Sequence, residues 1–422
     1  MNAVRGMTWW SDRLGRAVAS AVGLALVTAA CSGGPDRPDQ EAAPGIAWTE
    51  CGDGLQCATV PVPLDWADPA GEQISLAVIR RPASKPDQRI GTLLVNPGGP
   101  GDTGVGLVRT GADIEAWGGG RFDVISWDPR GTHGSSPVKC FTSDAEEAAF
   151  WNGAAAYAVR TQDLARRCGE VMGPLLSHIS TADTVRDLDR LRELAGEGTI
   201  TYVGLSYGTF VGQVYATMFP DRVRAMVLDG LIDAVAFTTS AETRSAVDSE
   251  STDAVFGRFL ELCEQAGPGR CALAGHGETA AQRVARLFER ARQGPIPAPD
   301  ADPPGELVLS DLLVSSFSPL WAPCASNWPG RSEDRFTGSW NAGTAAPILL
   351  IGTRYDPNTG YRNAVRTEQL LGNAVLLTHD GYGHVSFQDP SACVEAAKTR
   401  YLVDLQAPAP GTVCPADRPP FS

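Results

Sequence analysis

A serine set between two glycines is the residue whose surroundings most suggest chemistry. Ser206 lies in VGLSYGTF, a Gly-x-Ser-x-Gly pattern that follows a short apolar run and precedes a helical one. On a turn from strand to helix, Gly204 and Gly208 allow the close packing that holds such a serine in a strained conformation. The chain has 46 glycines, so the pattern can also arise by chance, and Ser206 would then be an ordinary turn residue. Its potential partners decide between these interpretations.

A nucleophilic serine needs a base, and the chain offers five histidines for this role. The hydroxyl is a weak nucleophile until a neighbouring group accepts its proton. His384, in HDGYGHVSF, follows a predicted strand and could reach back over the carboxyl edge of a sheet, so we predict that it is the general base. His379 should pack or hydrogen-bond locally, and His133 could line the site, although a structural role is favoured. Two histidines have no placement that suggests a role: His178 and His276.

The base in turn needs an acid that orients it. Asp356, in IGTRYDPNTG, stands just beyond a predicted strand, and we predict that it accepts a hydrogen bond from His384 Nδ1. The rival carboxylates of Asp380 and Asp389 are interpreted as solvated loop groups. The order serine, aspartate, histidine along the chain is the order of the α/β-hydrolase arrangement.

A glycine-rich loop could supply the donors that stabilise a tetrahedral oxyanion, which needs two preorganised N–H groups. TLLVNPGGPGDTG is a predicted strand that runs into such a loop. We predict that the Gly99 N–H faces the Tyr207 N–H as the second donor. Taken alone, these glycines could equally form a tight turn. They do not indicate a phosphate-binding loop, because no GK[ST] follows them.

The pattern of apolar residues indicates the elements that would hold these groups. From residue 46 to 233, short apolar runs alternate with helical patterns, and the alternation resumes after residue 340. It predicts an α/β fold with a mostly parallel sheet and helices on both faces. We expect a helix at 184–195, a strand at 199–204, a helix from 207 that ends at Pro220, and strands at 347–352 and 374–378.

Residues 234–340 interrupt this alternation. They are polar and helical in pattern, contain the loop PIPAPDADPPGE, and predict a mainly helical cap inserted between the core segments 46–233 and 341–422. Carboxylates near the start of this cap could hold a substrate ammonium. A charge run is usually a solvated face, so none of them is assigned that role: Asp233, Glu242, Asp248, Glu250 and Asp253.

Several motifs together resemble the secreted tripeptidyl aminopeptidase-like α/β-hydrolases, which are related to prolyl aminopeptidases. They are NPGGPG, SWDPRG, GLSYGT, DPNTG, GYGH, CASNWP and the late pair Cys393 and Cys414, and the resemblance covers residue 46 to the C-terminus. It implies an α/β-hydrolase fold and a serine exopeptidase that releases short peptides, often tripeptides, or single residues from free N-termini. In this family the triad matches Ser206, Asp356 and His384, and the oxyanion donors match Gly99 and Tyr207.

This resemblance implies neither a metal nor an organic cofactor. The chain departs from the pattern of the family at DPNTG and at GTHGSSP, which contains Thr132 and His133. Neither departure touches the nucleophile, but both could alter the shape of the pocket.

The first thirty residues carry three arginines and the apolar run AVASAVGLALVTAA, which is too short for a membrane span and predicts a signal peptide at 1–30. Cys31 follows, and TAAC before SGG resembles a lipoprotein signal, in which this cysteine becomes the acylated first residue. Plain cleavage after Ala30 would instead release a soluble protein, and both routes imply export. Residues 31–45 are polar and rich in Pro and Gly, and predict a flexible tether.

The ten cysteines of an exported chain predict disulfides, because the compartment is oxidising and no CxxC pair indicates zinc. Nine remain when Cys31 is set aside, which allows at most four bridges. Pairing of sequence neighbours would link 51 to 57, 140 to 168, 263 to 271 and 393 to 414, and would leave Cys324 free.

The net charge of −14 argues against nucleic-acid binding, which needs clustered Lys and Arg. The expected partners are peptides with a free N-terminus, and a membrane only through a lipid at Cys31. A carboxylesterase or lipase could use the same triad, although residues 234–300 are too polar for an apolar lipase lid. A non-catalytic surface binding protein is the remaining alternative, which the complete triad disfavours. The oligomeric state is not predicted.

Overall fold

The computed structural model describes residues 45–111, 114, 116–152, 157–275, 277–300, 304–309 and 330–421. The predicted signal peptide at 1–30, Cys31 and the tether up to residue 44 lie outside the described residues, as do His276 and Cys324. In the part that is described, no helix is long and apolar enough to cross a membrane.

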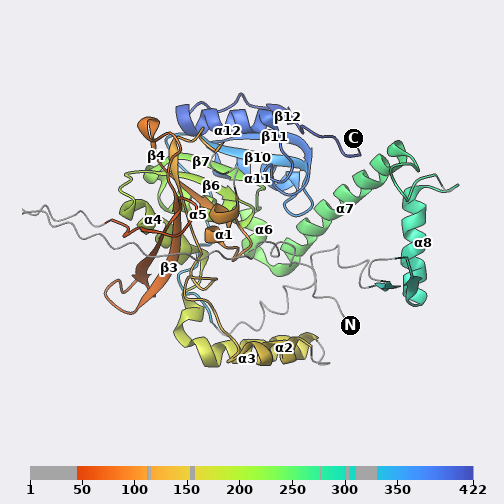
Figure 1. Cartoon of the computed structure of the whole chain (residues 1–422), viewed down its shortest axis with the longest axis horizontal. Helices are drawn as coiled ribbons and strands as arrows, with labels where there is room; N and C mark the ends of the chain where they lie inside the picture. The colour runs from red at the N-terminus through yellow and green to blue at the C-terminus, as the bar shows by residue number, and fades with distance from the viewer. Residues whose placement is uncertain are drawn as a thin grey trace, which may run out of the picture. The chain divides into compact units, whose positions relative to one another are not determined.

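A ten-stranded sheet organises the chain (Figure 1), in the order β1-β2-β3-β5-β4-β6-β7-β10-β11-β12. The strands β1, β2, β3 and β5 pair antiparallel, and all pairs from β5 to β12 are parallel. The prediction of a mostly parallel sheet is therefore confirmed. The strands are β1 (Thr49–Glu50), β2 (Gln56–Pro63), β3 (Gln73–Arg81), β4 (Gly91–Asn96), β5 (Phe122–Trp127), β6 (Ile200–Leu205), β7 (Val223–Asp229), β10 (Ile348–Tyr355), β11 (Ala374–Tyr382) and β12 (Val413–Pro415).

Helices cover both faces of this sheet, because each central strand is apolar on both sides and every residue of β4, β5 and β6 is buried. One hydrophobic core lies between the sheet and α4, α5 and α11, and a second core lies between the sheet and α1 and α12. The helices of the core are α1 (Gly104–Thr110), α4 (Thr181–Leu194), α5 (Tyr207–Met218), α11 (Tyr361–Leu371) and α12 (Ala392–Asp404), with the 3₁₀ turns η1 (Pro86–Gln88), η3 (Gly173–Ser177) and η4 (Pro220–Arg222).

Several elements differ from the sequence-based expectation. Strands β10 and β11 extend to Tyr355 and Tyr382, beyond the expected ends at 352 and 378. Helix α4 begins at Thr181 rather than near Thr184, because the Ser180 hydroxyl caps it by accepting from Asp183 N. Strand β12 was not predicted. It has only three residues and extends the sheet beyond β11, the last predicted strand.

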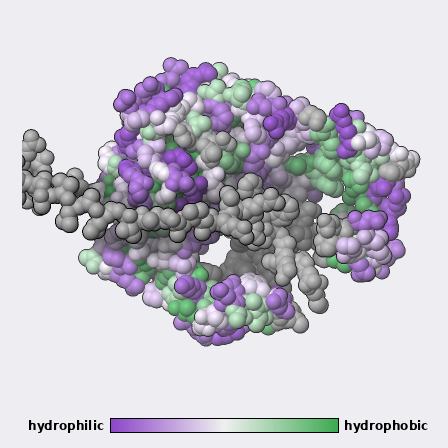
Figure 2. All heavy atoms as spheres, in the orientation of Figure 1, coloured by the Kyte–Doolittle hydropathy of each residue, from purple (hydrophilic) through white to green (hydrophobic). Residues whose placement is uncertain are grey.

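The segment between β7 and β10 is an insertion that is mainly helical, as predicted from its polar pattern. It contains α6 (Ala234–Thr239), α7 (Ala241–Ala266), α8 (Ala280–Gln293) and the two-stranded pair β8 (Ile296–Ala298) and β9 (Gly305–Leu307). Its face is less uniformly polar than expected, because the side chains of Phe256 and Phe259 on α7 are exposed and stack on each other. Figure 2 shows hydrophobic residues along α7 among hydrophilic ones. The helices α2 (Asp144–Trp151) and α3 (Tyr157–Met172) form a second excursion, between β5 and α4.

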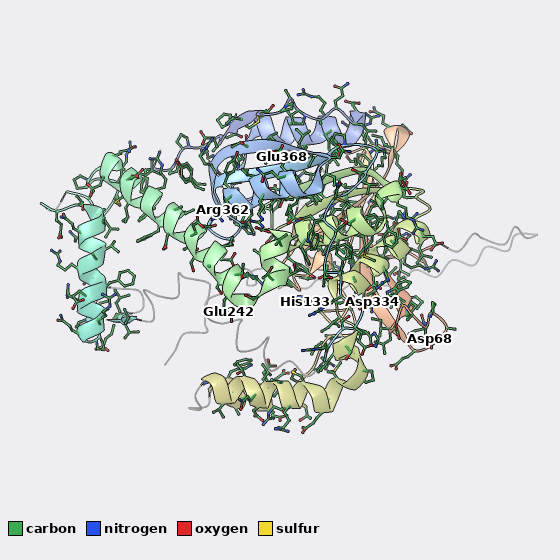
Figure 3. The ribbon with its side chains drawn as sticks, turned by 180° about the vertical axis from the view of Figure 1, so that it is seen from behind. Asp68, His133, Glu242, Asp334, Arg362 and Glu368 are labelled. Carbon is green, nitrogen blue, oxygen red and sulfur yellow. A yellow bond between two sulfur atoms is a disulfide. The ribbon has the colours of Figure 1, made fainter. Side chains whose placement is uncertain are left out.

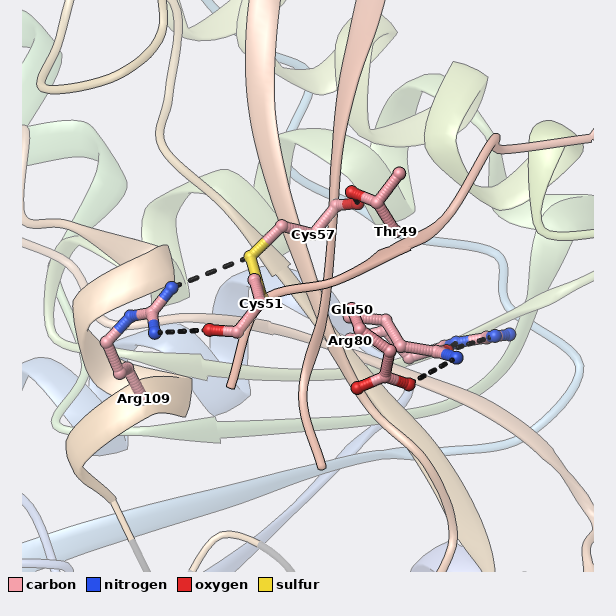
Figure 4. The surroundings of a disulfide bond; sticks show 7 residues. Thr49, Glu50, Cys51, Cys57, Arg80 and Arg109 are labelled. Atoms are coloured by element: carbon pink, nitrogen blue, oxygen red, sulfur yellow. Dashed lines mark hydrogen bonds between the residues drawn. A yellow bond between two sulfur atoms is a disulfide. The ribbon is translucent and has the colours of Figure 1, made fainter. Parts of the chain in front are cut away.

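Four disulfides join the pairs that the sequence predicts: Cys51–Cys57, Cys140–Cys168, Cys263–Cys271 and Cys393–Cys414. The first of these closes the short β1–β2 hairpin, where Arg109 on α1 donates to Cys51 O and to Cys57 Sγ (Figure 4). The last joins α12 to β12. Such cross-links stabilise a fold largely by restricting the unfolded chain.

Candidate active site

Ser206 lies on a tight turn between β6 and α5, the geometry that its sequence pattern predicts. Its backbone has φ 53° and ψ −121°, a left-handed conformation that costs a non-glycine residue about 1–3 kcal/mol. The flanking glycines are required by close approach. A Cβ on Gly204 would lie 2.3 Å from Gly208 O, and a Cβ on Gly208 would lie 2.5 Å from Asn96 O. A hydrogen bond of 2.9 Å from Ser206 N to Asp229 O ties the start of the turn to the end of β7.

The glycine-rich loop after β4 passes directly over this turn. Gly98 N donates to Asn96 Oδ1 at 3.0 Å, and a Cβ on Gly98 would lie 2.6 Å from Leu205 O and 2.9 Å from Tyr207 N. Only glycine therefore permits this approach, at a backbone φ of 107°. Gly99 lines the same cavity as Ser206, and Tyr207 N is the first amide of α5, where helix N–H groups are unpaired.

Asp128, which directly follows β5, fixes the residues that follow the glycine-rich loop. Its buried carboxylate accepts hydrogen bonds from Thr103 Oγ1 at 2.6 Å, Val105 N at 3.2 Å and Gly134 N at 3.0 Å. The SWDPRG motif thus contributes a structural carboxylate that supports the loop bearing Gly99. This role of Asp128 was not predicted from the sequence, because Thr103, Val105 and Gly134 lie in other segments of the chain.

His384 and Asp356 are brought together from the loops that follow β11 and β10. His384 Nδ1 lies 3.0 Å from both Oδ1 and Oδ2 of Asp356. The Asp356 carboxylate is 1% exposed and also accepts from Asn358 N, Thr359 N and Thr359 Oγ1 at 2.7–2.9 Å, so its orientation is fixed. Because an ionised carboxylate only accepts hydrogen bonds, the His384 proton lies on Nδ1 and the Nε2 lone pair is free.

The rival carboxylates have other partners. Asp380 forms an exposed ion pair with Arg354 at 2.6 Å, and Asp389 accepts from Tyr382 N at 2.6 Å. Neither is hydrogen-bonded to His384. Of the aspartates considered from the sequence, the structure places only Asp356 against this histidine.

The surroundings of His384 raise its pKa above the ordinary value of 6.5. Burial alone would lower the pKa, because it disfavours the charged ring. The hydrogen bond and the charge of Asp356 outweigh burial, and the charges of Asp229 and Asp102 add to their effect. The site therefore favours the imidazolium that would form when His384 accepts a proton.

Gly230 connects the two halves of the site. It follows Asp229, whose carbonyl holds Ser206 N, and a Cβ on Gly230 would lie 3.4 Å from His384 Cε1 and 2.6 Å from Val385 Cγ1. Its φ of 73° also favours glycine. The serine turn and the histidine loop thus meet at the end of β7. The Ser206 hydroxyl has no hydrogen-bond partner among the described residues.

A cavity opens beside Ser206, between the core and the inserted helices. Its apolar wall includes Phe237 on α6, and its charged groups are already paired. Arg244 lies over the Phe237 ring at 4.5 Å and pairs with Asp248 at 3.6 Å, while Asp233 pairs with Arg366 at 3.0 Å. Burial raises the pKa of Asp248, and Arg244 opposes this rise. The lining residues are Gly99, Ser206, Ile232, Asp233, Ala236, Phe237, Arg244, Val247, Asp248, Pro357, Asn358, Thr359 and Asn363.

The other described histidines do not line the cavity beside Ser206. His379 is buried in β11 against Thr353 Oγ1, and its Nε2 is 3.6 Å from Asp389. His133 is exposed on the loop after β5 (Figure 3), and its backbone is left-handed with φ 40°. His178 contributes its carbonyl to Arg130 Nη1.

Among the described residues, no group of three or more His, Cys, Asp or Glu side chains is arranged to hold a metal ion.

The acidic candidates of the insertion separate into two kinds. Asp233 and Asp248 line the cavity, whereas Glu250 forms an exposed ion pair with Arg362 on α11, a residue that Figure 3 labels.

Comparison with known proteins agrees with this architecture. Residues 315–414 match a family model described as TAP-like protein. This match covers only the C-terminal part of the chain, while the mostly parallel sheet with helices on both faces has the α/β-hydrolase architecture. The chain is similar to the serine protease Hip1 of Mycobacterium tuberculosis, with 27% identity over 87% of this chain and 91% of that protein.

Two further relatives carry different names. A tripeptidyl aminopeptidase of Streptomyces coelicolor is 38% identical over 45% of this chain and 38% of its own length. A carboxylesterase B of Mycobacterium tuberculosis is 29% identical over 93% of this chain and 95% of its own length. Relatives of this chain therefore include proteins named for peptide and for ester hydrolysis.

Proposed function

We propose that the protein is an exported serine exopeptidase that releases short peptides, such as tripeptides, or single residues from free N-termini. The observation that carries the proposal is the Asp356–His384 pair, which meets the strained Ser206 turn at the end of β7. Such a constellation is recognised by its geometry and roles rather than by its position in the sequence.

In this proposal Ser206 Oγ attacks the scissile carbonyl carbon and its proton passes to His384 Nε2. Asp356 holds His384 through Nδ1 and stabilises the imidazolium that forms. The carbonyl oxygen becomes an oxyanion that accepts hydrogen bonds from Gly99 N and Tyr207 N. His384 then returns its proton to the leaving amine as the C–N bond breaks, which gives an acyl-enzyme on Ser206. Water attacks this ester with His384 again as the base, and the released acid leaves Ser206 protonated.

Several observations favour peptides as substrates. Two of the relatives are named a serine protease and a tripeptidyl aminopeptidase. The inserted helices close one side of the cavity at Ser206 and place the carboxylates of Asp233 and Asp248 in its wall, where a substrate ammonium would share them with Arg366 and Arg244. A free N-terminus can therefore be recognised close to the reacting carbonyl.

Ester hydrolysis is the second candidate. It uses the same triad, and the relative named carboxylesterase B is similar over nearly the whole chain. Only a direct comparison of substrates separates the two activities.

Export forms part of the proposal. The predicted signal at 1–30 and the four disulfides among the described residues both fit an oxidising compartment. The proposed membrane anchor is a lipid on Cys31. Mass spectrometry of the mature N-terminus tests this point, because a diacylated Cys31 supports the anchor and an unmodified N-terminus contradicts it.

The activity is tested with a chromogenic tripeptide anilide that has a free amine, its N-acetylated form, and an acyl ester of matched size. We expect the free-amine anilide to be cleaved much faster than the acetylated form, and Ser206→Ala to abolish cleavage. Equal cleavage of both anilides would contradict the exopeptidase proposal. Rapid cleavage of the ester alone would favour the esterase. No reaction of the folded wild-type protein with a fluorophosphonate would contradict every serine-hydrolase function.

A further inference from the structure

Asp229, the last residue of β7, contacts both halves of the proposed active site. Its carbonyl accepts the hydrogen bond from Ser206 N at 2.9 Å. Its carboxylate accepts from Ser386 N at 3.1 Å and 3.2 Å and from Ser386 Oγ at 2.5 Å. Ser386 follows His384 by two residues, so one residue holds the nucleophile turn through its backbone and the histidine loop through its side chain.

The strand that carries Asp229 provides a rigid base for both contacts. Strand β7 lies inside the sheet between β6 and β10, and Asp229 is 1% exposed and in register with Leu205 and Ile351. The next residue, Gly230, is fixed by its hydrogen bond to Ile351 O. A displacement of the Asp229 side chain would therefore move the histidine loop relative to a turn that stays in place.

Among the residues that the structure describes, no cationic group forms an ion pair with the carboxylate of Asp229. Within the described part of the chain, the nearest basic influence is Lys398 on α12, whose Nζ pairs with Glu395 and which acts on Asp229 only through space. Burial raises the pKa of Asp229, whereas Lys398 and the hydrogen bonds from Ser386 oppose this rise. Burying a charge without an ion-pair partner is costly, so an apolar or amide side chain would serve packing alone at least as well.

Asp229 also acts on His384 electrostatically. The charged groups that influence this ring come from three elements: Asp356 after β10, Asp229 on β7 and Asp102 in the glycine-rich loop. All three are acidic and stabilise the imidazolium. The Asp356 carboxylate does so by direct contact, and Asp229 does so from beneath the loop.

We propose that Asp229 is a positioning residue, which sets the placement of His384 relative to Ser206 and supports the charge that His384 acquires in the reaction. The inference deepens the proposed function and rests on it. Asp229 does not touch the substrate, and its effect passes through Ser386 and His384.

The test compares Asp229→Asn and Ser386→Ala with the wild type in steady-state kinetics over pH and in the rate of inactivation by a fluorophosphonate. We expect Asp229→Asn to lower kcat about 10- to 100-fold with KM within about twofold, since a small misplacement of a catalytic group has an effect of this size. The acidic limb of its kcat/KM profile should move to lower pH, because the loss of a negative charge lowers the pKa of His384. Ser386→Ala should lower kcat without moving this limb, because the charge remains.

Asp123→Asn is the matched control. Asp123 is a buried carboxylate on β5 that accepts from Ala83 N and Arg89 Nε, both at 2.9 Å, away from the site. It should change the melting temperature and leave kcat and the pH profile as in the wild type.

Several outcomes would overturn the inference. An Asp229→Asn variant with wild-type kcat and an unmoved acidic limb, however unstable, would show that Asp229 is only structural. If this variant does not fold, an unchanged kcat in Ser386→Ala still refutes the link between β7 and the histidine loop. A wild-type protein that does not react with the fluorophosphonate contradicts the proposed function itself, which distinguishes that failure from a failure of the inference.

Discussion

The two sides of the cavity beside Ser206 are held in different ways. On the core side, the groups follow buried strands and are fixed by backbone hydrogen bonds, such as Ser206 N to Asp229 O. On the side of the insertion, Arg244 and Asp248 are each about a quarter exposed and depend on one another. The positions that the proposed mechanism uses for bond cleavage thus rest on the rigid sheet. The groups that would meet the substrate side chain lie on helices that can vary without disturbing the sheet.

The largest expected effect is on the core side. Asp356→Asn should lower kcat about 10³- to 10⁴-fold, because the amide no longer stabilises the imidazolium or fixes the proton on Nδ1. The size of the side chain is kept, so the melting temperature should change little in comparison. Initial rates of the purified proteins at saturating substrate concentration measure the change in kcat. A fall in kcat of less than tenfold would mean that another group orients His384.

The packing of the serine turn is the next most sensitive feature. Gly208→Ala would press a methyl group toward Asn96 O, which lies 2.5 Å from the ideal Cβ position. We expect a cost of about 1–3 kcal/mol in the free energy of unfolding and a strong loss of kcat. Gly257→Ala on α7 is the matched control, since no atom lies within 4 Å of its added Cβ. It should stabilise the helix by about 0.5–1 kcal/mol and leave kcat unchanged. Chemical denaturation measures the free energy of unfolding of both variants, and steady-state kinetics measure their kcat. Equal losses in Gly208→Ala and Gly257→Ala would remove the distinction between core and insertion.

The pH dependence reports on the histidine of the core side. In the proposed mechanism His384 must be neutral to act as the base, and its surroundings raise its pKa above 6.5. Activity should therefore be complete only above the raised pKa and fall about tenfold per pH unit below it. The measurement is kcat/KM over about five pH units, from about pH 4 to 9. We expect the midpoint of its acidic limb to lie above 6.5. A limb at or below 6.5 would contradict the influence of Asp356 on the ring.

The smallest effects are expected on the insertion side. Asp248→Asn removes one proposed partner of the substrate ammonium, so KM should rise for every free-amine substrate. It also leaves Arg244 without its partner, so among these substrates those with an acidic side chain beside the scissile bond should gain in kcat/KM relative to neutral ones. Arg244→Gln should favour basic side chains instead. Both shifts should be about 3- to 10-fold, because the pair is partly exposed and solvent screens it. Competition between matched tripeptide anilides measures them. A comparable loss of kcat for all substrates would place this pair in the catalytic machinery.

The parts of the site that chemistry restricts most were predictable from the sequence. Few residue types can serve as nucleophile, base and acid, and five histidines left a short search, so Ser206, Asp356 and His384 could be selected and are found on the loops expected. The turn could be predicted because Gly204 and Gly208 have a steric function that the structure shows. The disulfides could be predicted because each one joins a cysteine to the next cysteine along the chain, and these neighbours lie close together in the fold.

The contacts that cross the fold could not be predicted in this way. Asp229 and Ser386 are 157 residues apart, and nothing local to either residue indicates the other. Arg244 and Asp248 are paired within one helix, α7. Their position beside Ser206, however, depends on how α7 packs against the core. Strand β12 is too short for a periodic pattern, and its pairing with β11 defines it instead. Each of these features depends on long-range packing, which a pattern of residue types does not encode.

The ends of the sheet have a consequence for how the protein behaves among other chains. One edge is the two-residue β1 beside a disulfide, and the other is the three-residue β12, which ends at Pro415 and is tied to α12 by Cys393–Cys414. A foreign strand that docked on β1 or β12 would find few amides to align with, and Pro415 offers none. These two edge strands are therefore poor templates for strand addition, a useful property for a protein expected to work outside the cell, where no ATP-driven chaperone would rescue it.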